Sequence, residues 1–256
     1  IEGPTAPATI HAVTEAVAAR VGAELAAVGV DLTLAPDVDV NSNPRNPVIG
    51  VRSFGADPAL VSRHAAAWVR GVQSTGVSAC AKHFPGHGDT AQDSHLALPT
   101  VDADLATVRA RELPPFVAAI EAGAATVMTS HILVPVLDRE LPSTFSRPIL
   151  EGVLRGELGF AGAVVTDALD MAGASAGRGI PAAAVLALAG GSDLLCLGTR
   201  TTDAQLAEIC AAIDAAVDDG VLPVERLADA AARCDALGAT HASRRGAAPH
   251  PVPPTH

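Results

Sequence analysis

Short apolar runs bounded by turn residues alternate with helical stretches along this chain, and this alternation constrains the fold more than any other feature. We expect strands at residues 30–36, 77–82, 125–130, 163–167 and 193–197. Between the first two, Asp57 and Pro58 supply a helix cap and a first-turn proline, and apolar residues follow at helical spacing. Further helices are expected from Ser146 to about residue 156 and over residues 202–218. The alternation is typical of parallel βα units.

These units predict an α/β fold of the (β/α)8 TIM-barrel type, whose catalytic groups lie at the C-terminal ends of the strands. A doubly wound sheet would instead carry a glycine-rich phosphate loop after its first strand, and the sequence has none there. Only about five of the eight βα units are recognisable over residues 1–240, so the predicted barrel is incomplete. Residues 241–256 show no periodicity, which predicts a disordered tail or linker.

Composition excludes several classes of partner. The 49% hydrophobic content is ample for a core, and the net charge of −11 argues against nucleic acid, because no basic cluster offsets phosphate repulsion. No apolar stretch approaches the roughly 20 residues of a membrane span. The four cysteines are scattered, which disfavours a zinc ribbon or a redox pair. The compartment, cytoplasmic or secreted, and the oligomeric state are left open.

A cluster of histidines follows the expected strand at 77–82 and consists of His83, His87 and His95. The spacing of the first two resembles that of helical zinc ligands, but Pro85 and Gly86 lie between them and break a helix, so we expect no metal. Histidines that cap a tight loop are a second interpretation, notably for His87. Catalysis is the third.

Two neighbours of the cluster favour catalysis. Lys82 is the only lysine in a chain whose other basic residues are arginines, which suggests a need for a compact ammonium that donates to substrate hydroxyls. Asp93 lies two residues from His95, where a carboxylate can fix the imidazole tautomer and raise its basicity. This pair is therefore a candidate general acid–base.

Three more candidates follow other expected strands. Asp167 ends an apolar strand, where an ionised group is costly unless it is used or paired, and is the candidate nucleophile. Asp170 is interpreted as a cap or a solvated residue. Arg52, in a polar loop that otherwise reads as turn chemistry, is a candidate clamp for substrate hydroxyls. His131, directly after a strand, is a weaker candidate for which a structural role is equally favoured.

The motifs that carry these residues occur in a fixed order: Ile-Gly-Val-Arg-Ser-Phe around Arg52, Lys-His-Phe-Pro-Gly-His-Gly from Lys82 to Gly88, Asp-Ser-His from Asp93 to His95, and Thr-Asp-Ala-Leu-Asp-Met around Asp167. Over residues 4–237 the chain resembles glycoside hydrolase family 3, specifically its β-N-acetylglucosaminidase branch. The resemblance implies a retaining glycosidase, without cofactor, that removes terminal β-linked N-acetylglucosamine from peptidoglycan-type substrates.

The resemblance also implies the residue roles. Asp167 would form a covalent glycosyl-aspartate, and His95, oriented by Asp93, would protonate the leaving oxygen and then activate water. Arg52, Lys82, His83 and His131 would bind the sugar. A neutral imidazole repels anions less than a carboxylate does, so a phosphorylase is an alternative; an inactive barrel fragment is another.

The resemblance has one departure. Family members carry three strands before the one matching residues 30–36, and the last ends in an Asp-Gln-Glu-Gly-Gly motif that this sequence lacks. The resemblance therefore implies an N-terminally truncated barrel, and we hypothesise that the chain is a fragment of a longer polypeptide. Such a motif shortly upstream in the reading frame would support the hypothesis, whereas a stop codon followed by a native start would contradict it.

Overall fold

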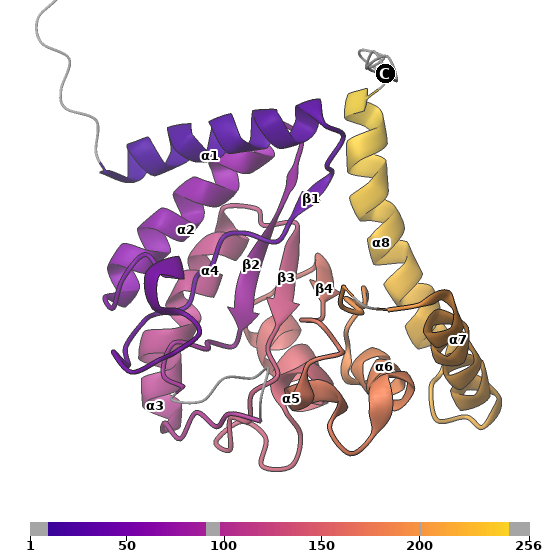
Figure 1. Cartoon of the computed structure of the whole chain (residues 1–256). Coiled ribbons are helices and arrows are strands. Elements are labelled where there is room, and N and C mark those ends of the chain that lie inside the picture. The colour runs from indigo at the N-terminus through magenta and orange to yellow at the C-terminus, as the bar shows by residue number, and fades with distance from the viewer. Residues whose placement is uncertain (1–9, 91–97, 200, 246–256) are drawn as a thin grey trace, which may run out of the picture.

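The computed structural model describes residues 10–90, 98–199 and 201–245 and centres on a parallel four-stranded sheet in the order β1-β2-β3-β4 (Figure 1). The strands are β1 (Leu32–Thr33), β2 (Ser78–Phe84), β3 (Thr126–Thr129) and β4 (Ala163–Val165). Leu32 pairs with Ser78, Cys80 with Thr126, and Thr126 with Ala163. Residues 193–197 join β4 through the single bridge between Val165 and Leu194 rather than as a full strand.

Helices precede the first strand, connect successive strands and follow the last one. They are α1 (Ile10–Ala27), α2 (Pro58–Gln73), α3 (Leu105–Thr107), α4 (Leu113–Glu121), α5 (Ala172–Ser175), α6 (Gly179–Gly190), α7 (Asp203–Asp218) and α8 (Val224–Arg245), with π-helical η2 (Val108–Glu112) and η4 (Pro148–Glu157) and short turns η1 (Gly50–Arg52) and η3 (Ser143–Phe145). The expected cap is confirmed, since the Asp57 side chain accepts from Ala59 N at the start of α2. Thr202 forms a capping box with Gln205 at the start of α7.

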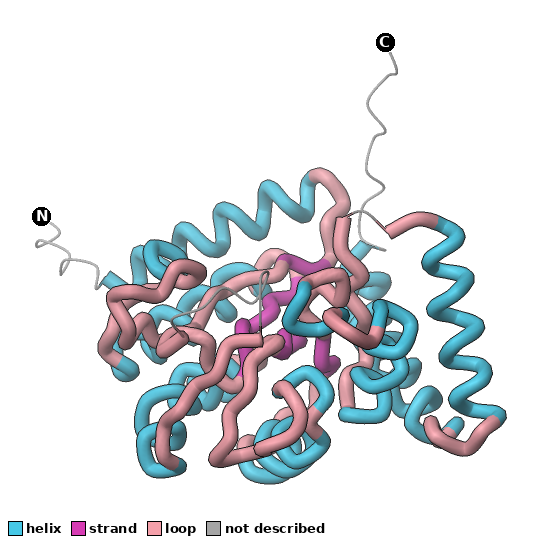
Figure 2. Tube along the Cα trace, turned by 60° about the horizontal axis from the view of Figure 1, so that its bottom comes forward, coloured by secondary structure: helices cyan, strands magenta, loops and turns pink. Residues whose placement is uncertain are grey.

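Strand order follows chain order, and every pairing is parallel. Among the described residues the sheet shows no reversal of strand order, whereas a doubly wound sheet needs one. The predicted parallel βα units are confirmed, and closure into a (β/α)8 barrel stays a prediction. All carboxyl ends of the strands lie at one end of the sheet, where the loops gather in the view of Figure 2.

The main core lies between the sheet and helices α2 and α4, and includes Val69, Phe84, Phe116 and Val127. The rings of Phe84 and Phe116 meet edge to face with centroids 5.1 Å apart. Helix α1 packs on α2, where Gly71 leaves room for the α1 backbone at Glu15.

A charged cluster fastens α8 to the end of the described sheet. Buried Asp193 accepts hydrogen bonds from Arg226 and Arg233 of α8 and from Arg155 of η4. Helix α8 continues to Arg245, so the prediction of a disordered tail from residue 241 is wrong for its first residues. The apolar residues of α8 recur at helical spacing up to Leu237 and not beyond it, so its last turns carry no such signal. Residues 246–256 lie outside the described part. No helix within the described ranges has the length and apolar character needed to cross a membrane.

The aromatic contact between β2 and α4 sets a stability prediction. Phe116→Ala should lower the free energy of unfolding by about 3 to 5 kcal/mol, because it opens a cavity against Phe84 in the core. Chemical denaturation followed by circular dichroism measures the loss. Val117→Ala, on the exposed side of α4, is the matched control and should change stability far less. Equal losses for the two variants would contradict the core assignment.

Candidate active site

The predicted site residues converge on the carboxyl ends of the strands. Lys82 and His83 lie in β2, His131 follows β3, and Asp167 follows β4. The Asp37 backbone forms a parallel bridge with Lys82, which brings the loop after β1 beside the end of β2. Segments far apart in the sequence therefore lie together at the carboxyl ends of the strands, as the parallel topology requires. We call this group of residues, which includes Asp37, Lys82, His83, His131 and Asp167, the rim.

Asp39 is the centre of this rim. Its fully buried carboxylate accepts from Nδ1 of His83 at 2.7 Å and from the backbone N–H of His87 at 2.6 Å. The backbone N–H of His83 donates to both of its oxygens at 3.3 Å. Burial raises the pKa of Asp39, while the charge of His87 and the hydrogen bonds to its carboxylate oppose that rise. One side chain thus fixes both histidines of the turn.

His83 is buried, and burial lowers its pKa to about 4, against the opposing effects of Asp37 and Asp167. The imidazole is therefore neutral near pH 7. Because its Nδ1 donates to the Asp39 carboxylate, its Nε2 is the unprotonated ring nitrogen and can accept a hydrogen bond. This form suits an acceptor for a sugar hydroxyl.

Asp37 is a second buried carboxylate in the rim. Its Oδ1 accepts from Asp39 N at 3.1 Å, and its Oδ2 has no hydrogen-bond donor among the described residues. The nearest cation to Oδ2 is Nη1 of Arg52, at 3.7 Å. Burial raises the pKa of Asp37 to about 7, and the negative charge of Asp39 adds to this rise. Electrostatic interactions with His83 and Arg52 act in the opposite direction.

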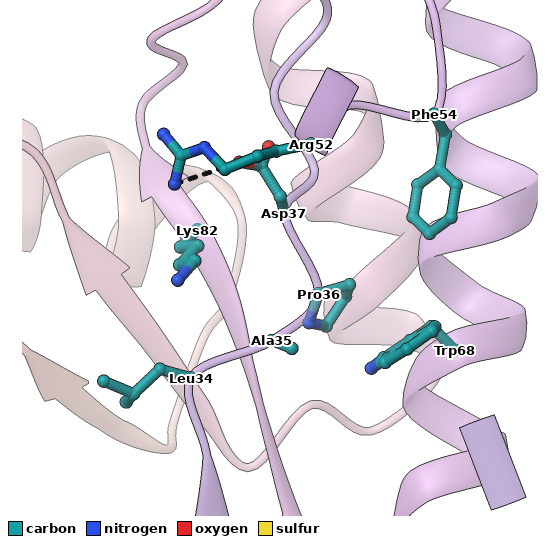
Figure 3. Close-up of a pocket in the computed structure, with 8 residues that line it drawn as sticks. All are labelled: Leu34, Ala35, Pro36, Asp37, Arg52, Phe54, Trp68 and Lys82. Atoms are coloured by element: carbon teal, nitrogen blue, oxygen red, sulfur yellow. Dashed lines mark ion pairs between the residues drawn. The ribbon is translucent and has the colours of Figure 1, made fainter. Parts of the chain in front are cut away.

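Arg52 and Lys82 line a cavity of about 310 Å³ with Asp37, and Figure 3 shows the guanidinium and the carboxylate turned toward each other. The other side of the cavity is apolar and is formed by Leu34, Ala35, Pro36, Phe54 and Trp68. Nε of Arg52 donates to Val48 O at 2.9 Å, which anchors the side chain to its own loop. A polar end beside an apolar wall is typical of small-molecule pockets.

Asp167 is partly buried, and its Oδ1 accepts from Ala168 N at 2.8 Å. Its negative charge partly offsets the fall in pKa that burial causes at His83 and His87, so the carboxylate lies within electrostatic range of the turn after β2. The nucleophile candidate and the sugar-binding candidates of β2 thus occupy the same rim.

His131 is fully buried, with Nδ1 2.8 Å from Oγ1 of Thr144. Its Nε2 lies 3.0 Å from the carbonyl oxygen of Ala168, and since a carbonyl only accepts, Nε2 donates. Both ring nitrogens therefore contact protein groups, which favours the structural interpretation: His131 holds the residue next to Asp167. Its predicted contact with sugar stays a prediction.

Asp93 and His95 lie outside the described residues, so their role as an acid–base pair stays a prediction. The chain leading to them is anchored at Asp89, which accepts from Arg111 at 2.6 Å. Arg111 also donates to buried Glu112, which packs beneath Gly86; burial raises the pKa of Glu112 to about 7.

The sequence analysis missed Asp37, Asp39 and Asn46. The Asn46 amide donates to the carbonyls of His87 and Gly88 at 2.8 and 3.0 Å, while its oxygen accepts from Val48 and Ile49. Asp37 and Asp39 could have been found from the sequence, because they come directly after the first strand, at the end of the barrel where catalytic groups lie. We had interpreted that loop as turn chemistry.

One group in the described part brings three potential metal ligands together: atoms of Asp37, Asp39 and His83 lie within 4.8 Å of one another. The Asp39 carboxylate and His83 Nδ1 already bond each other, and backbone donors occupy the remaining Asp39 lone pairs. We assign no metal to these residues, and the expectation of a metal-free site stays a prediction.

Comparison with known proteins identifies the class that this fold and rim define. The model of the glycosyl hydrolase family 3 N-terminal domain matches residues 5–237, and the chain belongs to this family. The predicted family is thereby confirmed, and the N-terminal domain of the family is a TIM-barrel-like α/β fold.

Individual relatives support the N-acetylglucosaminidase branch. A β-hexosaminidase of Chromobacterium violaceum is 41% identical over 76% of this chain and 55% of its own length. The family 3 β-N-acetylglucosaminidase structure from Paenibacillus sp. FPU-7 has 42% identity and a TM-score of 0.90, over 95% of this chain and 46% of that one. A structure titled β-glucoside phosphorylase BglX has 31% identity and a TM-score of 0.85, over 92% and 43%. The chain thus spans about half the length of these relatives.

The Asp39 contacts generate a prediction for the site. Asp39→Ala should destabilise the fold by about 3 kcal/mol or more, because it leaves three buried donors unpaired at roughly 1 kcal/mol or more each. Asp39→Asn, which keeps one acceptor oxygen, should lose less. Denaturant titration of both variants measures the difference. A stability of Asp39→Ala within about 1 kcal/mol of the unchanged protein would contradict the network.

Proposed function

We propose that this protein is a retaining glycosidase that removes terminal β-linked N-acetylglucosamine, with peptidoglycan-derived fragments as its substrate class. The observation that carries the proposal is the shared rim of Lys82, His83 and Asp167 in a chain of family 3. The hexosaminidase and N-acetylglucosaminidase names of its relatives support the substrate class.

In the first step, the Asp167 carboxylate attacks the anomeric carbon while the bond to the leaving oxygen breaks. The leaving oxygen takes a proton from His95, and a glycosyl-aspartate forms. The partial burial of Asp167 and the backbone N–H of Ala168 at its Oδ1 hold one oxygen in place during attack. Lys82, Arg52 and His83 supply donors and an acceptor for the sugar hydroxyls.

In the second step, water attacks the anomeric carbon and His95 takes its proton, which releases Asp167 and retains the configuration. Most retaining glycosidases use a second carboxyl about 5 Å from the nucleophile for this task. Here an imidazole oriented by Asp93 takes that role.

A second candidate function is phosphorolysis, in which phosphate replaces water in the second step. The similarity to a structure titled β-glucoside phosphorylase supports this alternative. A neutral imidazole base would not repel the incoming dianion as a carboxylate would.

Asp167→Asn should reduce turnover of a chromogenic N-acetyl-β-glucosaminide by about four orders of magnitude, because an amide cannot form the glycosyl ester. Release of the chromophore by the full-length protein measures it. Asp214→Asn, an exposed position on α7, is the matched control and should keep full activity. Residual activity of Asp167→Asn close to that of the control would contradict the nucleophile assignment.

Product analysis separates the two reactions. With N-acetyl-β-glucosaminide in phosphate buffer, we expect free N-acetylglucosamine, released first as the β-anomer because two displacements retain configuration. Nuclear magnetic resonance during the reaction detects the anomer and any sugar phosphate. Sugar 1-phosphate as the main product would replace hydrolysis by phosphorolysis, and preference for a β-glucoside would overturn the substrate class.

A further inference from the structure

Asp37 has a position that the proposed catalytic steps leave unexplained. Its side chain is 6% exposed, and its backbone pairs with Lys82, which places both residues on the same edge of the cavity. A buried carboxylate oxygen without a hydrogen-bond donor costs about 1 to 3 kcal/mol, so a residue of purely structural use is expected to satisfy it. Oδ2 of Asp37 is such an oxygen among the described residues.

The geometry around Oδ2 identifies what the carboxylate does. Arg52 is held at Nε by Val48 O, and its Nη1 faces Oδ2 at 3.7 Å, too far for a hydrogen bond but close for an ion pair (Figure 3). The Arg52 side chain is 39% exposed, whereas the carboxylate beneath it is buried. The anion therefore attracts the guanidinium without consuming its donors, which stay available to a ligand.

We propose that Asp37 is a positioning residue, whose buried charge holds the Arg52 guanidinium over the cavity in the orientation that binds the sugar hydroxyls. The inference rests on the proposed function and adds a residue that acts through Arg52. Because Oδ2 of Asp37 is buried beneath Arg52, we assign it a role through the guanidinium rather than a direct contact with the sugar.

The charges facing Asp37 define its pH dependence. Asp39 repels its anionic form from the same loop, while Arg52 stabilises that form. His83 of β2 also faces Asp37 but is neutral near pH 7, and Lys82 of β2 is the further cation of the cavity. With a pKa raised to about 7, chiefly by burial, Asp37 is ionised above neutrality and loses its charge below it. Its attraction for Arg52 should weaken over the same range.

Ionised Asp37 also carries a cost in stability. Its folded pKa lies above its unfolded value of 3.8, so the folded state binds the extra proton between the two, and stability falls as pH rises through about 7. Above neutrality the buried charge is a net liability for folding. Retaining it there at the expense of stability is expected of a residue with a functional role.

A double-mutant cycle on the full-length protein tests the proposal, with a chromogenic N-acetyl-β-glucosaminide as the probe. At pH 8, Asp37→Asn should raise KM about three- to tenfold with little change in kcat, because it loosens a group that binds ground state and transition state alike. Arg52→Ala should raise KM at least as much. Adding Asp37→Asn to Arg52→Ala should change KM less than about twofold, since the group it positions is gone.

Three further readouts separate positioning from support of the fold. Asp37→Asn should be at least as stable as the unchanged protein at pH 8, and Asp37→Glu should recover part of the lost KM. The KM of the unchanged protein should rise as pH falls through about 7, and that of Asp37→Asn should not. Asp214→Asn is the control and should match the unchanged protein throughout.

Additive effects of the two substitutions on KM, or a loss of stability in Asp37→Asn at pH 8, would overturn the proposal. So would a metal requirement, seen as loss of activity with EDTA, that Asp37→Asn removes. If the unchanged protein released no N-acetylglucosamine, the proposed function would fall and this inference with it. Activity in the unchanged protein with additive variants would overturn the inference alone.

Discussion

The buried carboxylate of Asp39 is the interaction on which the rim depends. It gathers three donors from the turn after β2, two from His83 and one from His87, and so ties the loop after β1 to that turn. An ionised group at this depth is tolerated because its lone pairs are occupied, and the same bonds fix the tautomer of His83. Loss of this carboxylate would release the segment in which the sugar-binding candidates lie.

The carboxylates of the rim differ in how many hydrogen bonds they accept. Asp39 is fully bonded and serves the architecture, whereas Asp37, two residues earlier, keeps one oxygen without a donor beneath Arg52. Asp167 stands across the rim with one oxygen on the backbone of Ala168, and His131 binds the carbonyl of that residue. Asp39, Asp167 and His131 are thus each held by hydrogen bonds to neighbouring groups, which is the preorganisation that glycoside cleavage at a single carbon requires.

The sequence predicted the order and parallel pairing of the strands because apolar runs between turn residues depend on local patterning. It also placed Lys82, His83 and Asp167 at strand ends and Arg52 in the loop that follows the first strand, where the fold puts them. Asp37 and Asp39 escaped because an aspartate pair after a strand has the composition of an ordinary turn, and its burial arises only when residues 83–88 pack over it. Helix α1 was missed because its apolar residues define no single face. In α8 the apolar residues recur at helical spacing up to Leu237 and could have predicted that part of the helix, but not its last turns.

The central claim is that Asp167 forms a covalent bond to the sugar. A fluorinated N-acetylglucosaminyl fluoride slows the second displacement more than the first, so it should accumulate the glycosyl-enzyme. Mass spectrometry of the full-length protein after such treatment should show one added sugar, and peptide mapping should place it on Asp167. An adduct on another residue, or inactivation without any adduct, would contradict the account.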